Sequence, residues 1–248
     1  MQVLVVKDYQ EMSKEAAKIF KARMESKADL VMGLATGSTP IGTYKELIQM
    51  VEKGELSFDQ ATAFNLDEYY GLDASHPQSY ARFMKDQLFK SVDISVDNTF
   101  IPNGMAEDVQ EECASYDALI EKHGGLDLQL LGIGGNGHIG FNEPDESLSA
   151  GTHQVDLDMA TIEANSRFFE SLDQVPKKAL TMGMGSILKA KEILLLASGA
   201  NKAEAVGGLL SGKITTDNPA SFLQLHPKVT VIIDQELADC LESEKKIA

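Results

Sequence analysis

The sequence predicts an α/β protein built on an open, mostly parallel β-sheet, and three observations carry this prediction. Short apolar runs alternate with amphipathic helical stretches along the whole 248-residue chain. The runs are apolar at nearly every position, which is typical of strands covered on both faces. The stretches between them leave room for the right-handed crossover connections that parallel strands need.

Six apolar runs are expected to form strands, and they are Val3–Val6, Leu30–Ala35, Ala61–Leu66, Leu126–Ile133, Ile193–Ala197 and Val229–Ile233. Helical patterns lie between them at Asp8–Met24, Pro40–Lys53, Ser79–Lys90, Ala106–His123, the turn that precedes Lys189, and Asn201–Leu210. Pro40 suits the first turn of its helix, because the N–H that proline lacks has no partner there. We therefore expect one Rossmann-like domain over residues 1–248, with helices on both faces of the sheet.

Composition and charge restrict the partners of the chain. Hydrophobic residues make up 43% and charged residues 24%, as in ordinary globular proteins. The formal net charge of −16 argues against nucleic acid and anionic membranes as partners. No apolar run reaches the ~20 residues of a membrane span, and the N-terminus lacks the basic start of a signal peptide. A phosphorylated small molecule remains compatible, because it needs only a local cluster of donors.

The cysteines and histidines favour a cytoplasmic protein without a metal. Cys113 and Cys240 lie far apart, which is typical of reduced thiols and not of a disulfide bridge. The five histidines show none of the spacings of zinc sites. We therefore expect a cytoplasmic location and no catalytic metal.

The most informative stretch is the sequence GIGGNGHIGFNEP, which follows a predicted buried strand and occupies residues 132–144. A glycine-rich turn at the carboxyl end of a strand lets the backbone approach a ligand closely. His138 is followed five residues later by Glu143, and such a pair can act as an oriented acid–base couple. The stretch therefore predicts a site whose chemistry is proton transfer.

A dinucleotide site is the obvious alternative interpretation of this stretch. Gly132, Gly134 and Gly137 spell the G-x-G-x-x-G fingerprint after a strand. That fingerprint requires a helix to begin at its last glycine, and no helical apolar period follows here. Pro144 also disfavours the helical conformation at Glu143. The structural context of the fingerprint is absent, so we do not expect a dinucleotide.

Three further features offer donors for an anion. The segment 36–39 brings hydroxyl and N–H groups to a helix N-terminus, a natural anion site, although plain helix capping explains the same residues. Lys202 opens a predicted helix, where a cation is disfavoured unless an anion lies near. Arg167 stands beside two phenylalanines, so it either packs its stem on them or donates two hydrogen bonds to a phosphate.

A carboxylate, Asp67, follows the third predicted strand. The end of an apolar strand partly desolvates such a group, and desolvation raises its pKa and its basicity. Capping of the next turn explains an aspartate here equally well. Ligands of open α/β sheets lie beyond the carboxyl ends of the strands, so these segments are expected to converge on one crevice.

Five segments together resemble the glucosamine-6-phosphate deaminase family, and they are ATGSTP at 35–40, FNLDEY at 64–69, GNGHIGFNEP at 135–144, ANSRFF at 164–169 and LQLHP at 223–227. The resemblance covers essentially the whole chain in order. It implies the interconversion of glucosamine 6-phosphate with fructose 6-phosphate and ammonia, without a metal or an organic cofactor. The implied partner is a small sugar phosphate.

The resemblance also implies catalytic roles. Asp67 would be the base that moves a proton between C2 and C1, and His138 would open the sugar ring by moving a proton between O5 and O1. Glu143 would hold His138 in the required tautomer and charge state. Asn136 stands where many members of the family carry aspartate. An asparagine can orient His138 but stabilises an imidazolium less, so we expect a shifted pH profile.

The residues that the resemblance implies for the 6-phosphate are Gly37, Ser38, Thr39, Arg167 and Lys202. Two cations and helix N–H groups would explain how an acidic protein binds an anion. The segment of about residues 149–175, which carries Arg167, resembles a small mobile lid of the family. Its closure would exclude water from the reaction intermediate.

The resemblance places the chain in a short, non-allosteric subclass of the family. Long, hexameric members bind the phosphate of N-acetylglucosamine 6-phosphate at positions that fall here on Glu146, His153, Val155 and Asp156. Two of these are acidic and one is apolar, so they would repel or ignore a phosphate. The chain also lacks much of the C-terminal extension of the long members. We expect a non-allosteric monomer.

Three alternatives remain at this stage. A 6-phosphogluconolactonase would not need a carboxylate placed for deprotonation at C2, so Asp67 argues against it. A galactosamine-6-phosphate isomerase differs in the configuration at C4, and no motif in the sequence reads that hydroxyl. A non-catalytic sugar-phosphate sensor would carry a helix-turn-helix extension and a basic patch, and the sequence shows neither.

Overall fold

A computed structural model describes residues 1–157, 162, 169, 171 and 174–247. The strands are β1 (Gln2–Val6), β2 (Val31–Leu34), β3 (Thr62–Asn65), β4 (Asp67–Tyr70), β5 (Thr99–Phe100), β6 (Leu128–Leu131), β7 (His153–Asp156), β8 (Lys178–Thr181), β9 (Ile193–Ala197) and β10 (Val229–Asp234). The α-helices are α1 (Tyr9–Ser26), α2 (Ile41–Glu52), α3 (Tyr80–Gln87), α4 (Val109–Lys122), α6 (Met184–Leu188), α7 (Ala203–Leu209) and α8 (Gln235–Ile247). Short 3₁₀ turns include η4 (Ala200–Lys202) and η5 (Pro219–Leu225).

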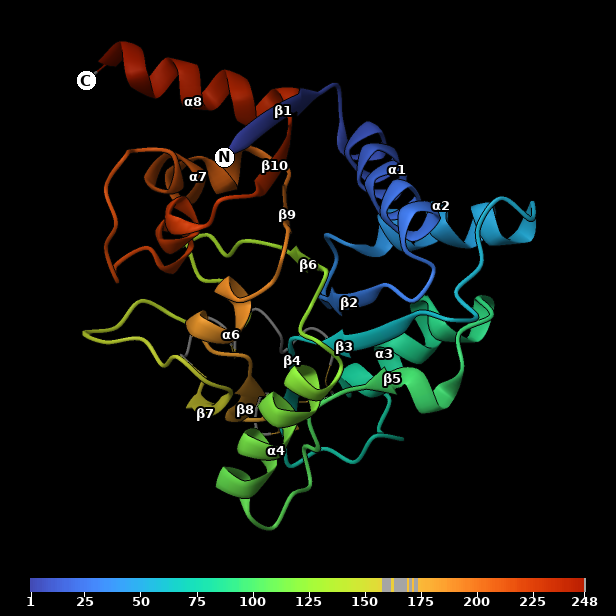
Figure 1. Cartoon of the computed structure of the whole chain (residues 1–248). Coiled ribbons are helices and arrows are strands. Elements are labelled where there is room, and N and C mark those ends of the chain that lie inside the picture. The colour runs from blue at the N-terminus through green and yellow to red at the C-terminus, as the bar shows by residue number, and fades with distance from the viewer. Residues whose placement is uncertain (158–161, 163–168, 170, 172–173, 248) are drawn as a thin grey trace.

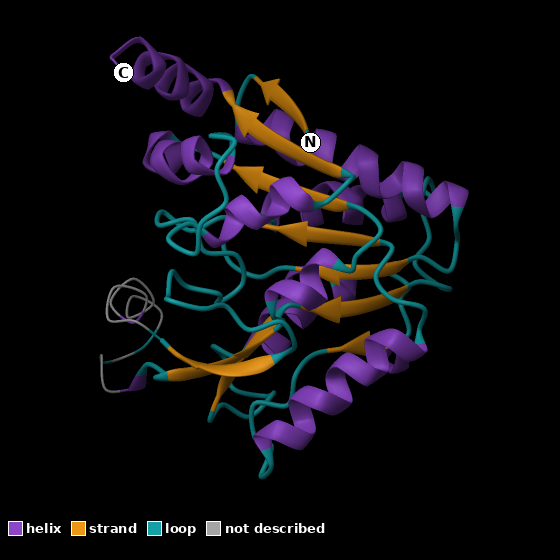
Figure 2. Cartoon of the chain, turned by 60° about the vertical axis from the view of Figure 1, so that its left-hand side comes forward, coloured by secondary structure: helices purple, strands orange, loops and turns teal. Residues whose placement is uncertain are grey.

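Seven strands form one sheet in the order β1-β10-β9-β6-β2-β3-β5, and every pair in it is parallel. The arrowheads of these strands point to the same side in Figure 2. All six predicted strands lie in this sheet, so the prediction of an open parallel α/β sheet is confirmed. The sequence analysis did not predict β5, which has two residues, or helix α8 at the end of the chain.

Helices cover both faces of the sheet, as predicted (Figure 1). On one face, Met12, Phe20 and Leu47 of α1 and α2 pack with Met32 and Leu130 of the sheet. On the other face, side chains of α4, α6, α7 and α8 pack against the alternate residues of the same strands. The near-continuous apolar strands of the sequence are therefore explained by two cores, one on each side of the sheet.

The order of connections reverses between two neighbouring strands, β2 and β6. From β2 the chain proceeds outward to β3 and β5, and it then returns to β6 on the other side of β2 and proceeds to β9 and β10. Loops beyond the carboxyl ends of such a pair diverge and leave a crevice. The loops that follow β2 and β6 are the segments at 35–40 and 132–144, so the topology brings these two segments together.

A second, three-stranded antiparallel sheet has the order β4-β8-β7. The chain passes into it directly from the first sheet through Leu66. The N–H of Leu66 donates to Leu34 O at 3.0 Å, and its carbonyl accepts from Met182 N at 2.8 Å. The sequence analysis did not predict this sheet, because its short strands mix charged and apolar residues without a clear alternation. Asp67 therefore begins a strand of the second sheet.

The segment of about residues 149–175, expected to be a lid, is described in part. It contains β7, and Phe169 lies against the aromatic cluster that includes Tyr69 and Phe141. Residues 158–161, 163–168, 170, 172 and 173, including Arg167, lie outside the described residues. None of the helices in the described ranges has the length and apolar character that crossing a membrane requires.

At the end of the sheet opposite the crevice, the carboxylate of Asp127 joins three segments. It accepts the N–H of Val31 at 2.9 Å and pairs with Lys27 and with Lys191, the latter at 2.7 Å. The side chain of Asp127 is only 9% exposed, whereas both lysines reach solvent. Removing a buried carboxylate that satisfies a buried N–H leaves that donor unpaired.

Asp127→Ala is expected to lower the free energy of unfolding by about 2–3 kcal/mol, through the unpaired Val31 N–H and the lost ion pairs. Asp86→Ala is the matched control, since Asp86 also pairs with two cations, Arg82 and Lys90, but its side chain is 33% exposed. We expect it to cost less than about 1 kcal/mol. Urea unfolding measures both, and equal losses would contradict the assignment.

Candidate active site

A cavity of about 850 Å³ opens beyond the carboxyl ends of β2 and β6. Its walls come from the two loops at that edge, the start of β4, the start of α3 and η4. The cavity is large enough for a small-molecule ligand. It lies at the reversal of strand order, where such folds hold their ligands.

His138 is held by Glu143 in the loop that follows β6. The Nδ1 atom of His138 lies 2.9 Å from Oε2 of Glu143. A proton on Nδ1 donated to this carboxylate leaves Nε2 free to exchange a proton with a ligand. The His138 side chain is 27% exposed and lines the cavity, whereas the Glu143 side chain is 12% exposed behind it. The predicted acid–base couple is therefore assembled.

Asn136 supports this couple through Glu143. Its Nδ2 donates to the same Oε2 of Glu143 at 2.6 Å, and its Oδ1 accepts the backbone N–H of His138 at 3.2 Å. The amide is thus a donor to the carboxylate, a contact that an aspartate at this position could make only when protonated. The sequence analysis expected Asn136 to orient His138. In the structure, the side chain of Asn136 contacts Glu143, and Glu143 contacts the imidazole of His138.

Two glycines of the loop make this geometry possible. A Cβ on Gly134 would lie 2.3 Å from Cε1 of His138, so the imidazole rests directly on the glycine backbone. Gly137 has φ +86°, and a Cβ there would lie 2.5 Å from Oδ1 of Asn218. No helix follows Gly137 in the described stretch 132–157, which agrees with the exclusion of a dinucleotide fingerprint. Gly134 therefore makes room for the imidazole of His138, and Gly137 makes room for the side chain of Asn218.

Asp67 lies at the junction of the two sheets and is 6% exposed. Burial, and then the negative charge of Glu68, raise the pKa of Asp67 to about 8. Its Oδ1 is buried without a hydrogen-bond partner among the described residues. A Cβ on Gly140 would lie 3.7 Å from Oδ2, so the glycine leaves space beside the carboxylate. Asp67 lines the cavity, and burial raises its pKa in the direction that the sequence analysis expected.

The loop after β2 is anchored by a residue that the sequence analysis missed, Tyr9 of α1. Its hydroxyl lies 3.0 Å from Ser38 O and 3.1 Å from Thr39 O, and it accepts the N–H of Gly42 at 2.9 Å. Gly37 has φ +88°, a conformation that favours glycine. Gly37, Ser38 and Thr39 all line the cavity.

Lys202 enters the same cavity from η4, at the start of α7. Burial lowers the pKa of its ammonium group, and Lys202 takes part in none of the ion pairs found in the described part of the chain. A half-buried cation in this state favours an anionic ligand.

A second missed residue, Asp234, braces the turn that carries Lys202. Its carboxylate accepts from Ser198 Oγ at 2.5 Å and from Gly199 N at 3.0 Å, and it caps α8 through Leu237 N at 2.9 Å. The sequence signal for Asp234 is its position, because an aspartate between a strand and a helix commonly caps that helix.

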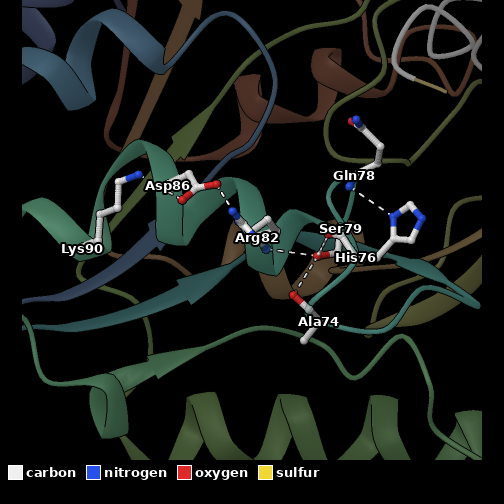
Figure 3. Close-up of polar contacts among 7 residues, drawn as sticks. All are labelled: Ala74, His76, Gln78, Ser79, Arg82, Asp86 and Lys90. Carbon is white, nitrogen blue, oxygen red and sulfur yellow. Dashed lines mark hydrogen bonds and ion pairs between the residues drawn. The ribbon is translucent and has the colours of Figure 1, made fainter. Parts of the chain in front are cut away.

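Helix α3 and the turn before it form the remaining wall. Figure 3 shows Ser79 at the start of the helix, where its Oγ accepts the N–H of Arg82 at 3.1 Å and contacts Ala74 O at 3.0 Å. Farther along the helix, Asp86 pairs with Arg82 at 2.6 Å and with Lys90 at 3.0 Å. Ser79 and Asp86 both line the cavity.

The cavity therefore brings together most of the predicted site residues, which are Gly37, Ser38, Thr39, Asp67, Asn136, His138 and Lys202, with Glu143 behind His138. Arg167 lies outside the described residues. Phe169 lines the cavity, and its ring centroid lies 6.3 Å from that of Tyr69 and 6.3 Å from that of His76. In the described ranges, no group of three or more histidine, cysteine or acidic side chains could hold a metal ion.

The four positions that the resemblance linked to a regulatory phosphate are absent from this cavity lining. His153, Val155 and Asp156 are on β7, and Glu146 is in the exposed loop before it. Asp156 lies opposite Lys178 of β8, with 3.6 Å between its Oδ1 and the lysine Nζ. An acidic side chain already paired to a neighbouring lysine does not favour a phosphate here.

Comparison with known proteins agrees with this site. The profile of the family described as glucosamine-6-phosphate isomerases/6-phosphogluconolactonase matches residues 7–232. The chain belongs to this family. A glucosamine-6-phosphate deaminase of Clostridium perfringens (strain ATCC 13124) is 56% identical over 242 residues, covering 98% of this chain and 100% of the relative. One of Thermoanaerobacter pseudethanolicus is 56% identical over 244 residues, covering 98% of this chain and 96% of the relative.

Solved structures of the family share the architecture. A structure described as a monomeric glucosamine-6-phosphate deaminase has a TM-score of 0.94 at 51% identity, covering 97% of this chain and 100% of its own. A 6-phosphogluconolactonase of Trypanosoma brucei has a TM-score of 0.76 at 19% identity, covering 97% and 98%. The second likeness shows a common fold. The first matches this chain along nearly its whole length.

The high pKa of Asp67 has a consequence for stability. The unfolded group ionises near its ordinary pKa of 3.8, whereas the folded group keeps its proton up to about pH 8. Across this range the folded state binds more protons, so this residue makes stability fall as pH rises.

Asp67→Asn removes that ionisation, and we expect the variant to gain stability over the wild type progressively from pH 4 to pH 8, by on the order of a few kcal/mol. Melting temperatures over this pH range measure the difference. A difference that is constant with pH would show that Asp67 titrates normally.

Proposed function

We propose that the protein is a glucosamine-6-phosphate deaminase that converts glucosamine 6-phosphate and water to fructose 6-phosphate and ammonia. The observation that carries this proposal is the presence of two separate proton-transfer groups in one cavity, Asp67 on β4 and the His138–Glu143 couple in the loop after β6. An aldose–ketose shift needs one group at C1 and C2, and ring opening needs another at the anomeric oxygen. Relatives at 56% identity over nearly the whole chain bear the same name.

Ring opening is assigned to His138. Its Nε2 takes the proton from the O1 hydroxyl and gives it to O5 as the C1–O5 bond breaks, which leaves the open-chain aldehyde. Oε2 of Glu143 holds the imidazole of His138 through the 2.9 Å contact with Nδ1, and Asn136 Nδ2 donates to the same oxygen at 2.6 Å. The carboxylate stabilises the imidazolium that forms between the two proton transfers.

The shift of the double bond is assigned to Asp67. Its carboxylate removes the proton from C2, the electrons of that C–H bond form a double bond between C1 and C2, and O1 takes a proton from the substrate ammonium group, which gives an enolamine. Asp67 then returns its proton to C1, which leaves a protonated imine at C2. The imine at C2 then adds water and releases ammonia. A carboxylate with a pKa of about 8 is a far stronger base than an exposed aspartate. The ammonium group of the bound substrate favours the ionised form that this step requires.

The phosphate is assigned to the other end of the cavity. Gly37, Ser38 and Thr39 offer N–H and hydroxyl donors before α2, and Lys202 supplies a cation that lacks an ion-pair partner in the described part of the chain. Arg167, which the sequence places on the proposed lid at about 149–175, is the second cation of this proposal. A preformed phosphate anchor holds the reactive carbons at a defined distance from Asp67 and His138.

We further propose that the protein acts as a monomer in the cytoplasm, as one domain over residues 1–248. The solved relative at 51% identity is described as monomeric, which supports the first part. The positions of the regulatory site carry Glu146, His153, Val155 and Asp156, which supports a rate curve without cooperativity.

Ammonia release from glucosamine 6-phosphate tests the proposal. We expect Asp67→Asn to lower kcat by about 10³-fold, because the general base is lost. Asp73→Asn, in an exposed turn, is the matched control and should retain wild-type turnover. Turnover of galactosamine 6-phosphate alone would change the substrate and keep the chemistry, whereas hydrolysis of 6-phosphogluconolactone without ammonia release would overturn the proposal.

Lys202→Met tests the phosphate site separately. Loss of a charged hydrogen bond to the ligand is expected to raise KM about 10- to 100-fold, while kcat changes much less, since the phosphate is distant from the reacting carbons. Lys189→Met, at an exposed lysine that pairs with Glu121, serves as the control. A fall in kcat at unchanged KM would remove Lys202 from this role.

A further inference from the structure

Glu68 is a buried carboxylate that the sequence analysis did not single out. It follows Asp67 on β4, and its residue is 2% exposed. Successive side chains of a strand point to opposite faces, so Asp67 faces the cavity while Glu68 faces away from it. Glu68 is absent from the cavity lining, which includes both of its neighbours, Asp67 and Tyr69.

Three backbone N–H groups converge on this carboxylate. Oε1 accepts from Tyr69 N at 2.8 Å and from Tyr80 N at 2.8 Å, and Oε2 accepts from Ala81 N at 2.8 Å. Tyr80 and Ala81 are the first two residues of α3. The third N–H of the helix, that of Arg82, is taken by Ser79 Oγ (Figure 3). Glu68 and Ser79 together satisfy the N-terminus of α3.

These contacts favour the ionised form of Glu68. Both oxygens accept hydrogen bonds from N–H donors, and the positive end of the helix dipole faces a negative charge. Burial raises the pKa of Glu68 above its ordinary value, and the N–H groups of Tyr80, Ala81 and Tyr69 oppose that rise. The result is an internal negative charge held one residue from Asp67.

The other titratable groups around Asp67 are buried phenols and residues of the cavity lining. Tyr44 of α2, Tyr80 of α3 and Tyr116 of α4 each have a pKa raised mainly by burial and partly by Asp67, so they are neutral near pH 7. His138 and Lys202 line the same cavity. After burial, the charge of Glu68 is the second cause that raises the pKa of Asp67.

We propose that Glu68 is a positioning residue of the reaction, which joins the strand that carries Asp67 to the N-terminus of α3 and places a negative charge beside the base. The proposal rests on the proposed function through the role of Asp67. It explains why a carboxylate lies here, because a side-chain amide has one oxygen and could accept only some of the three N–H groups. It also couples the base to the cavity wall, because α3 supplies Tyr80 and Phe83 to that wall.

The test is the pH dependence of kcat/KM in Glu68→Gln. Removing the charge lowers the proton affinity of Asp67, so the acid limb of the profile is expected to move to lower pH by on the order of one unit. The maximal rate is expected to fall several-fold, because the amide group faces an N–H donor. A lower rate with an unmoved acid limb would overturn the proposal and leave Glu68 with a structural role.

Ser79→Ala is the matched control. It removes the other cap of the same helix without removing a charge, so we expect a lower melting temperature and an unmoved acid limb. If Glu68→Gln does not fold, Glu68→Asp replaces it. The shorter side chain keeps the charge and cannot reach both helix N–H groups, so the acid limb should stay while stability falls. A shifted limb in Ser79→Ala or Glu68→Asp would contradict the assigned role of the charge.

A readout independent of turnover separates this proposal from the proposed function. The change in melting temperature that Asp67→Asn produces is measured against pH in two backgrounds, the wild type and Glu68→Gln. We expect this change to reach its plateau at a lower pH in the Glu68→Gln background, because Asp67 loses its proton earlier there. If the two curves of melting-temperature change against pH coincide, the proposed role of Glu68 is overturned. If the curves are displaced but the protein releases no ammonia, only the deaminase assignment is overturned.

Discussion

The burial of one carboxyl group, that of Asp67, organises the site. The chain leaves the parallel sheet at Leu66, whose N–H and carbonyl bond to β2 and to the residue after β8, and it enters the second sheet one residue later. This places Asp67 at the junction of two sheets, where solvent is excluded and the cavity begins. A base that must take a proton from carbon gains strength from such a position, and the fold bears the cost of an ionisable group in its interior.

The other charged groups of the cavity accompany the carboxyl group of Asp67. His138 is backed by Glu143, and the amide of Asn136 donates to that carboxylate without adding a second negative charge beside it. Lys202 enters the cavity from a turn that Asp234 braces. An acidic protein thereby keeps a half-buried cation and a desolvated carboxylate in one cavity, as the proposed function requires.

Much of the fold could be predicted from the sequence, because continuous apolar runs report strands that are buried on both faces. The second sheet could not, since β4, β7 and β8 are short and carry charged residues whose partners come from distant parts of the chain. The site was predicted where long glycine-rich or polar motifs follow a strand. Tyr9, Glu68 and Asp234 escaped prediction, because each acts through backbone groups that are remote in sequence or hidden by the fold.

The sequence by itself determined the parallel α/β class, the loop that carries His138 and Glu143, and the membership of the family. These features follow from sequence patterns that involve only residues close together along the chain. Only the tertiary structure decided that Asp67 is buried with a raised pKa, that Gly134 lies against the imidazole and that Glu68 caps α3. Burial and charge depend on which segments surround a group, and that arrangement exists only once the strands have paired and the helices have packed.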